Sequence, residues 1–320
     1  MDREILLKIR TGSHLYGLST PESDEDFGGI FLPKPEDVLG LQKMEEVDKS
    51  TKPSSKDEKN TKDDVDEKYY SLGKYLHLVL QNNPNIVEYL FVDTKNTLVT
   101  SPIWEELQSN YEKIISQKVW YSFSGYAYSQ RKNMIVKRDR YNSLVKGVDY
   151  IEKAYSHGEL VDPKYAISEK ESSDLNGLLK YYKGSKGNTE HYHKGMPLAT
   201  IYEKLVEERD KYGWRVKTDT FKSLGYSVKF GYHLIRLMAE AFELLRFGNI
   251  SYPLSGADWS TIMSIRNGNV PFDDLMKMYD VYYKQCEEEF KRTRLRKTPD
   301  WKWGNKWLIN TLLEEFTKEK

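Results

Sequence analysis

The sequence predicts an α+β protein, in which a small N-terminal domain of strands and helices is followed by a mainly helical C-terminal domain. Two β-prone segments lie near the N-terminus, at 5–10 and 24–33, and helical spacing of apolar residues dominates beyond about residue 100. The length of 320 residues favours two domains. We expect the division at residue 110, with domains 1–110 and 111–320.

The N-terminal elements follow from local composition. The apolar run 5–10 ends at Thr11-Gly12-Ser13, which indicates a strand running into a tight turn. Residues 24–33 begin acidic and end in an apolar run stopped by proline, as in a second strand. The charged insertion 43–66 has almost no apolar side chains and is expected to be a solvated loop. Helical spacing begins near residue 72, and Asn83-Pro84 offers an N-cap and first residue for another helix through Leu90.

The rest of the chain has mostly helical spacing. The expected helices cover 103–115, 120–136, 141–154, 175–182, 198–212, 224–247, 272–297 and 305–320.

Charge and composition exclude several classes of protein. Lysine plus arginine and aspartate plus glutamate both total 49, so the chain is neither strongly basic nor strongly acidic. Residues 1–100 carry a net charge of −6 and residues 101–320 one of +6, which favours an anion-facing C-terminal part. The single cysteine, Cys286, excludes an internal disulfide and a cysteine-based zinc cluster. No apolar stretch approaches the ~20 residues of a membrane span, and the N-terminus lacks a signal-peptide pattern, so we expect a cytoplasmic protein.

The segment 12–26 holds the most informative pattern. Asp24 and Asp26 lie two residues apart, so on a strand their carboxylates face the same way. Such a pair suits Mg²⁺ bound to a nucleoside triphosphate, and a preceding Gly-Ser turn offers N–H and hydroxyl groups to phosphate. The alternative for an isolated Asp-x-Asp is a solvated acidic turn.

The order and spacing of these residues closely resemble the signature of the DNA polymerase β-type nucleotidyltransferase superfamily, especially its minimal members. Gly12-Ser13 is followed, after ten residues that include Tyr16, by Asp24-x-Asp26. The resemblance implies a small mixed sheet. It also implies that Gly12 and Ser13 hold the phosphates of the nucleotide, and that Asp24 and Asp26 bind two Mg²⁺ ions, with Mn²⁺ as a substitute.

The superfamily has a third carboxylate on a neighbouring strand. Asp63, Asp64 and Asp66 lie at the end of the charged insertion. The segments 66–76 and 83–90 resemble predicted nucleotidyltransferases of phage and bacterial RNA-repair systems, in which an aspartate opens a short strand. This resemblance favours Asp66 as metal ligand and general base, with Asp64 as the alternative.

A second group of polar residues lies at helical spacing. Lys229, His233, Arg236 and Glu240 share one face of a predicted helix. The same subfamily has Lys, His and Arg-Leu at this spacing, which implies that Lys229 and Arg236 contact the triphosphate or the acceptor and that His233 orients a phosphate or base. The alternative is a solvent-facing stripe with an Arg236–Glu240 ion pair.

The resemblance implies transfer of a nucleoside monophosphate from a nucleoside triphosphate to a hydroxyl group, with release of pyrophosphate. The subfamily's link to RNA repair favours an RNA or tRNA 3′ end as the acceptor, in the cytoplasm of a bacterial or phage-infected cell. The alternatives are AMP transfer to a protein side chain, as in antitoxin-type relatives, transfer to a small molecule such as an aminoglycoside, and an inactive nucleotide-binding or interaction protein. The basic run 291–297 suits either a nucleic-acid backbone or a solvated helix end.

Overall fold

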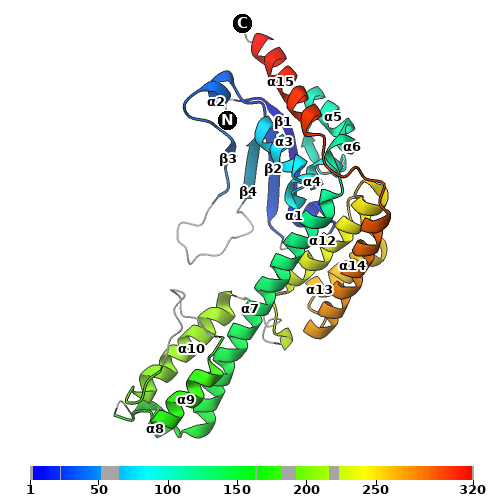
Figure 1. Cartoon of the computed structure of the whole chain (residues 1–320). Helices are drawn as coiled ribbons and strands as arrows, with labels where there is room; N and C mark the ends of the chain where they lie inside the picture. The colour runs from blue at the N-terminus through cyan, green and yellow to red at the C-terminus, as the bar shows by residue number, and fades with distance from the viewer. Residues whose placement is uncertain are drawn as a thin grey trace. The chain divides into compact units, whose positions relative to one another are not determined.

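The computed structural model describes residues 3–21, 23–51, 65–162, 164–181, 192–215 and 223–318 (Figure 1). The chain divides into two compact units. Unit 1 comprises Met1–Ala127, Ile235–Met263 and Met278–Lys320, and unit 2 comprises Tyr128–Leu234 and Ser264–Lys277. These units do not follow the division expected at residue 110, because two later segments of the chain return to unit 1.

Unit 1 is built on a five-stranded sheet of order β3-β4-β2-β1-β5. Figure 1 labels the strands from β3 to β1. The strands are β1 (Ile5–Arg10), β2 (Glu25–Phe31), β3 (Glu46–Asp48), β4 (Val65–Ser71) and β5 (Thr97–Val99). β2 and β4 pair in parallel, and the other neighbours pair antiparallel. The sheet is therefore mixed, and the α+β prediction is confirmed.

The charged insertion is not a continuous loop. Its residues 46–48 form the edge strand β3, and β4 already begins at Val65. The polar sequence is compatible with pairing because β3 lies at the sheet edge, where Lys68 and Glu46 form an ion pair of 3.1 Å. Residues 52–64 lie outside the described part of the chain.

The helices of the chain are mostly those that the apolar spacing predicts. They are α1 (Gly12–Leu15), α2 (Pro35–Leu39), α3 (Leu72–Leu80), α4 (Pro84–Val87), the 3₁₀ helix η1 (Glu88–Phe91), α5 (Pro102–Ser109), α6 (Tyr111–Ile114), α7 (Lys118–Ala154), α8 (His157–Val161), α9 (Glu169–Leu178), α10 (Leu198–Arg215), α12 (Val228–Phe247), α13 (Gly256–Arg266), α14 (Phe272–Arg292) and α15 (Trp301–Lys318). No described helix is long and apolar enough to cross a membrane.

Several helix predictions differ from the structure. The single helix expected at 103–115 is two short helices, α5 and α6. The helices expected at 120–136 and 141–154 are one helix, α7, because the charged residues between them are good helix formers and include no glycine or proline. Asn83 caps α4 as expected, with Oδ1 accepting the Asn85 N–H (3.1 Å), but the α-helix gives way to η1 after Val87. α14 ends at Arg292, so most of the basic run 291–297 lies beyond it.

The later helices of unit 1 are integral to its packing. α15 packs on α3, where a Cβ atom on Gly304 would lie 2.8 Å from Leu80 Cδ1. Unit 2 has its own apolar core from α7, α9, α10 and the segments between them, comprising Leu144, Val148, Ile151, Ile167, Leu175, Leu179, Tyr192, Leu198, Ile201 and Leu205.

Candidate active site

Gly12 and Ser13, which form the Gly-Ser turn, are the first residues of α1 and lie against the start of β2. The Thr11 N–H donates to the Asp26 carbonyl oxygen (2.9 Å), which extends the strand pairing into the turn. Gly12 has a φ of 63°, and a Cβ atom there would lie 2.3 Å from Oδ2 of Asp26. Glycine is required because a side chain would overlap the carboxylate and strain the left-handed backbone. The Asp26 carboxylate therefore lies directly against the predicted phosphate-binding turn.

The sheet brings Asp26 and Asp66 together. These two residues are paired across the parallel strands β2 and β4, so their side chains face the same side of the sheet. Asp66 is exposed, and so is Asp24, which directly precedes β2. Asp64, the alternative third carboxylate, lies outside the described residues.

The donor atoms in this region suit a hard divalent cation. Carboxylate oxygens are the ligands that Mg²⁺ and Mn²⁺ prefer, and like charges at neighbouring strand positions repel each other without a cation between them. Within the described ranges, no three acidic, histidine or cysteine side chains are already arranged to hold a metal ion. The residues therefore fit the expected ions by chemical type and by their common face, and a bound ion would have to draw the carboxylates together.

The backbone after the turn is held from two directions. The Leu18 N–H donates to the carbonyl oxygen of Ser13 (2.8 Å), which is half-buried in α1. The Leu254 N–H donates to the Tyr16 carbonyl (3.2 Å), and Trp259 Nε1 donates to the Gly17 carbonyl (2.8 Å). The position of the turn therefore depends on a segment more than 200 residues later in the chain.

A buried polar network lies behind the turn. The Tyr16 hydroxyl donates to Oε2 of Glu88 (2.6 Å), and Nη1 of Arg236 lies 3.8 Å from the same oxygen. Arg236 donates to both carboxylate oxygens of Glu240 (2.7 and 2.9 Å), and the Tyr252 hydroxyl donates to Oε1 of Glu240 (3.0 Å). The Arg236 guanidinium also lies 4.1 Å from the centre of the Tyr16 ring. Five side chains from four segments thus form one connected group.

The network holds two carboxylates and one guanidinium. Glu88, Arg236 and Glu240 are 4%, 3% and 1% exposed. Burial raises the pKa of Glu88 to about 7, against the attraction of Arg236 and with further contributions from the Glu240 and Asp26 charges. Burial also raises the pKa of Glu240, and Arg236 opposes the rise. The influence of Asp26 on Glu88 links the network electrostatically to the candidate metal ligands.

The polar face of α12 agrees only in part with the solvent-facing stripe that the sequence offered as an alternative. The Arg236–Glu240 ion pair is confirmed, but the solvent-facing stripe is wrong at these two positions because both side chains are buried. A direct contact of Arg236 with nucleotide stays a prediction. What the structure shows for this side chain is packing against Tyr16, directly after the Gly-Ser turn.

Lys229 and His233 belong to a different unit from the turn. Both belong to unit 2, whereas Arg236 belongs to unit 1. Lys229 is exposed, and the His233 ring lies 4.3 Å from the Tyr232 ring. Their predicted contacts with phosphate or base stay predictions.

Sequence reasoning assigned no role to Glu88, Tyr16 or Tyr252. Tyr16 and Glu88 lie in segments that resemble the superfamily. The available signal was a lone glutamate inside the apolar run Ile86 to Leu90, since a buried carboxylate needs polar partners.

Comparisons with known proteins identify a family that matches most of the chain. The family described as "RNA repair pathway DNA polymerase beta family" matches residues 1–253. The chain is also similar to an uncharacterized 38.9 kDa protein in the nrdC-mobD intergenic region of Enterobacteria phage T4, with 26% identity over 307 residues that cover 88% of each chain. No solved structure matches.

Proposed function

Since the chain belongs to the RNA repair pathway DNA polymerase beta family, we propose that it is a Mg²⁺-dependent nucleotidyltransferase acting on an RNA 3′ end, a tRNA included. It takes a nucleoside monophosphate from a nucleoside triphosphate and releases pyrophosphate. The matched region includes every proposed site residue, because all of them lie between residues 12 and 236. The phage relative supports a place of action in the cytoplasm of a bacterial or phage-infected cell.

One observation carries the proposal. The Asp26 carboxylate lies against Gly12, so the acidic strand end and the phosphate-binding turn are adjacent in the folded chain. The alternative for Asp24 and Asp26 is a solvated acidic turn. That alternative does not explain Gly12, where the close carboxylate and the left-handed backbone together require glycine. The paired position of Asp66 adds a second carboxylate on the same face.

Each residue then has a distinct task. Gly12 and Ser13 bind the triphosphate through backbone N–H groups and the serine hydroxyl. Asp24, Asp26 and Asp66 would hold Mg²⁺, or Mn²⁺ in its place; such ions would supply positive charge to the triphosphate and a lower pKa for the acceptor hydroxyl. The acceptor oxygen bonds to the α-phosphorus as the bond to pyrophosphate breaks, and Asp66 takes the hydroxyl proton.

The test is transfer of label from each of the four α-³²P nucleoside triphosphates to an RNA with a free 3′ hydroxyl, with Mg²⁺ present. Asp24→Asn, Asp26→Asn and Asp66→Asn should each lower transfer by about 100-fold or more, the order of loss for a group that stabilises transition-state charge. Glu25→Gln is the matched control, because Glu25 lies between the two aspartates on the opposite face of β2. It should keep near-normal activity.

The remaining outcomes distinguish the alternatives. Label on protein or on a small hydroxyl compound in place of RNA would replace the proposed acceptor. Absence of transfer to any acceptor, with nucleotide binding retained, would identify an inactive binding protein. Transfer that survives the Asp24→Asn and Asp26→Asn pair would show that the site lies elsewhere. Asp64→Asn, compared with Asp66→Asn, decides which residue is the third carboxylate.

A further inference from the structure

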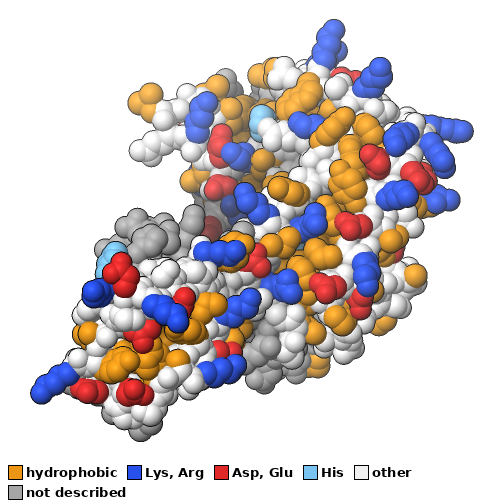
Figure 2. Space-filling view, turned by 60° about the horizontal axis from the view of Figure 1, so that its bottom comes forward, with side chains coloured by type: hydrophobic (Ala, Val, Ile, Leu, Met, Phe, Trp, Pro, Cys, Tyr) orange, Lys and Arg blue, Asp and Glu red, His pale blue; other side chains and the backbone are white. Residues whose placement is uncertain are grey.

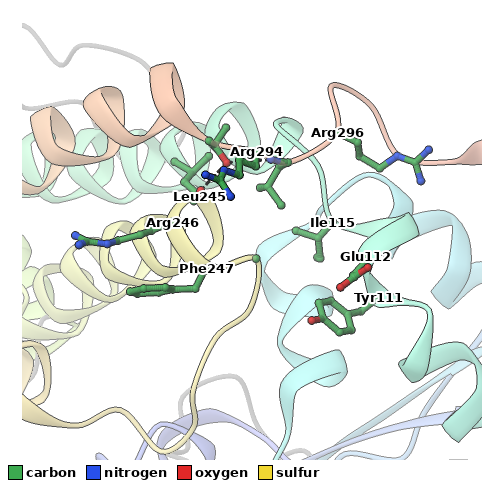
Figure 3. Close-up of a pocket in the computed structure, with 11 residues that line it drawn as sticks. Tyr111, Glu112, Ile115, Leu245, Arg246, Phe247, Arg294 and Arg296 are labelled. Atoms are coloured by element: carbon green, nitrogen blue, oxygen red, sulfur yellow. Dashed lines mark hydrogen bonds between the residues drawn. The ribbon is translucent and has the colours of Figure 1, made fainter.

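A basic hollow lies in unit 1 where three segments meet (Figure 3). It has a volume of about 510 Å³ and is lined by the end of α12, the residues that follow α14, and α6. A volume of this size accommodates a nucleotide-sized group. None of the proposed catalytic or nucleotide-binding residues lines it.

The lining of the hollow carries a surplus of positive charge, with three arginines and one acidic residue. Lysine, arginine and acidic side chains alternate over the face seen in Figure 2. The run 291–297, by contrast, contains five basic residues and no acidic one. Arg294 from this run and Arg246 from α12 are both exposed, and neither has a hydrogen bond or ion pair to any described residue. Glu112 is the acidic side chain in the lining.

Helix-end effects account for part of this charge only. Arg246 lies in the last turn of α12, where a cation is favourable beside the helix C-terminus. Arg294 lies outside any helix, so that explanation does not apply to it. Arg296 is already engaged, because it donates to the Lys113 carbonyl (3.2 Å) and forms an ion pair with Asp300 (3.2 Å). Arg246 and Arg294 are therefore the cations available to a ligand.

The wall that carries these arginines is fixed in place. The Thr293 hydroxyl donates to the Leu245 carbonyl, which ties the segment after α14 to the end of α12. The Gln117 N–H donates to the Arg296 carbonyl (2.8 Å), and the Gln117 side chain donates to the Leu295 carbonyl (3.1 Å). Because folding already orders this backbone, a ligand that binds here does not lose affinity to the entropy of ordering it.

An aromatic ring accompanies the charge. Phe247 is 63% exposed, and the Arg246 guanidinium lies 5.4 Å from the centre of its ring. Figure 3 shows both side chains extending from the end of α12 in the same direction, with Arg294 above them and Arg296 pointing away on the other side. Because these arginine side chains point in different directions, they do not surround a single small anion. A row of cations beside an exposed ring instead suits a strand of nucleic acid, whose phosphates repeat and whose bases stack.

We propose that this hollow, with Arg246, Phe247 and Arg294, binds the phosphate backbone of a single-stranded RNA. The proposal rests on the proposed function for the choice of RNA, as the strand that carries the acceptor end. The chemistry of recognition itself requires only repeated phosphates and an exposed base.

The test is equilibrium binding of the full chain to a fluorescent single-stranded RNA, followed by anisotropy at several NaCl concentrations in EDTA without nucleotide. Arg246→Gln with Arg294→Gln should weaken binding by about tenfold or more. Each lost phosphate contact makes the negative slope of log K against log salt shallower by about 0.7. The double variant should therefore have a slope that is shallower by about 1.4. The matched control, Lys277→Gln with Lys306→Gln, removes the same charge from exposed positions elsewhere and should leave both quantities nearly unchanged. Phe247→Ala should weaken binding without changing the slope.

Three results would overturn the inference: unchanged RNA affinity in the arginine pair, an equal loss in the control pair, or a loss of affinity for ATP but not for RNA. Because the variants replace exposed side chains, thermal unfolding should be unchanged and verifies folding. The assay contains no metal or nucleotide, so it is independent of catalysis. If the Arg246→Gln, Arg294→Gln variant loses RNA binding but the natural chain labels no acceptor, the RNA-binding surface is supported and the proposed transfer is refuted.

Discussion

Replacing Glu88 by glutamine tests the buried network behind the Gly-Ser turn. Two buried carboxylates, Glu88 and Glu240, share one guanidinium, that of Arg236. Glu240 forms the short two-oxygen contact with Arg236, whereas Glu88 lies 3.8 Å away. Glu88 is therefore the carboxyl that takes up a proton near neutral pH, consistent with its pKa of about 7. Glutamine mimics the protonated form and still accepts the Tyr16 hydroxyl.

The sign and size of the effect follow from linkage. The ordinary pKa of glutamate is 4.5, and in the folded chain that of Glu88 is about 7, so the folded state binds the proton more tightly than the unfolded state. The resulting contribution to the free energy of unfolding is fully present below pH 4.5 and is lost as the pH rises through 7. At about 1.4 kcal/mol per pH unit, the loss between pH 5 and pH 8 is about 2 to 3 kcal/mol.

Urea unfolding of both proteins at pH 5, 6, 7 and 8 measures this loss. From pH 5 to pH 8, the free energy of unfolding of the natural chain should fall by about 2 to 3 kcal/mol relative to that of Glu88→Gln. Glu45→Gln is the control, because the exposed Glu45 has a pKa lowered by Lys74 and is ionised throughout. If the natural chain and Glu88→Gln lose stability in parallel, Glu88 is not the group that titrates and the assignment is refuted.

Three further substitutions probe the same region. Gly12→Ala should lower nucleotidyl transfer by about tenfold or more and the urea-unfolding free energy by about 1–3 kcal/mol, because its Cβ would lie 2.3 Å from Asp26 Oδ2. Gly28→Ala should cost about 1–3 kcal/mol in the same measurement, because its Cβ would lie 2.1 Å from a tyrosine hydroxyl of η1. Tyr252→Phe removes the 3.0 Å hydrogen bond to Glu240 and should cost about 1–3 kcal/mol, with normal stability counting against the network.

The sequence predicted the elements whose signals are local. β1 and β2 are apolar runs ended by Gly-Ser and by proline, and Asn83 caps a helix through its own side chain. A strand with Asp66 beside β2 was expected from resemblance only, since nothing local relates two strands that are separated by a charged insertion. The three-residue strands β3 and β5 were missed because a strand of that length carries too little alternation to be recognised.

The face of α12 illustrates a limit of periodicity. Helical spacing correctly placed Lys229, His233, Arg236 and Glu240 on one side of a helix, but spacing does not say what covers that side. The covering changes along the helix, so that Lys229 is exposed and Glu240 is 1% exposed. The second half of α12 is buried because Tyr16, Glu88 and neighbouring residues pack against it. These contacts join residues far apart in sequence, so the spacing within the helix does not reveal them.

The same contacts indicate which part of the chain the candidate site depends on. A chain that ended at residue 110 would keep Tyr16 and Glu88 but lose Arg236, leaving a buried carboxyl without its cation. It would also lose the Leu254 and Trp259 donors that hold the backbone of the turn. A buried polar group without a partner costs about 1–3 kcal/mol, and several such losses together approach the whole stability of a domain. The turn and its carboxylates therefore depend on α12 and the residues after it, which belong with them to unit 1.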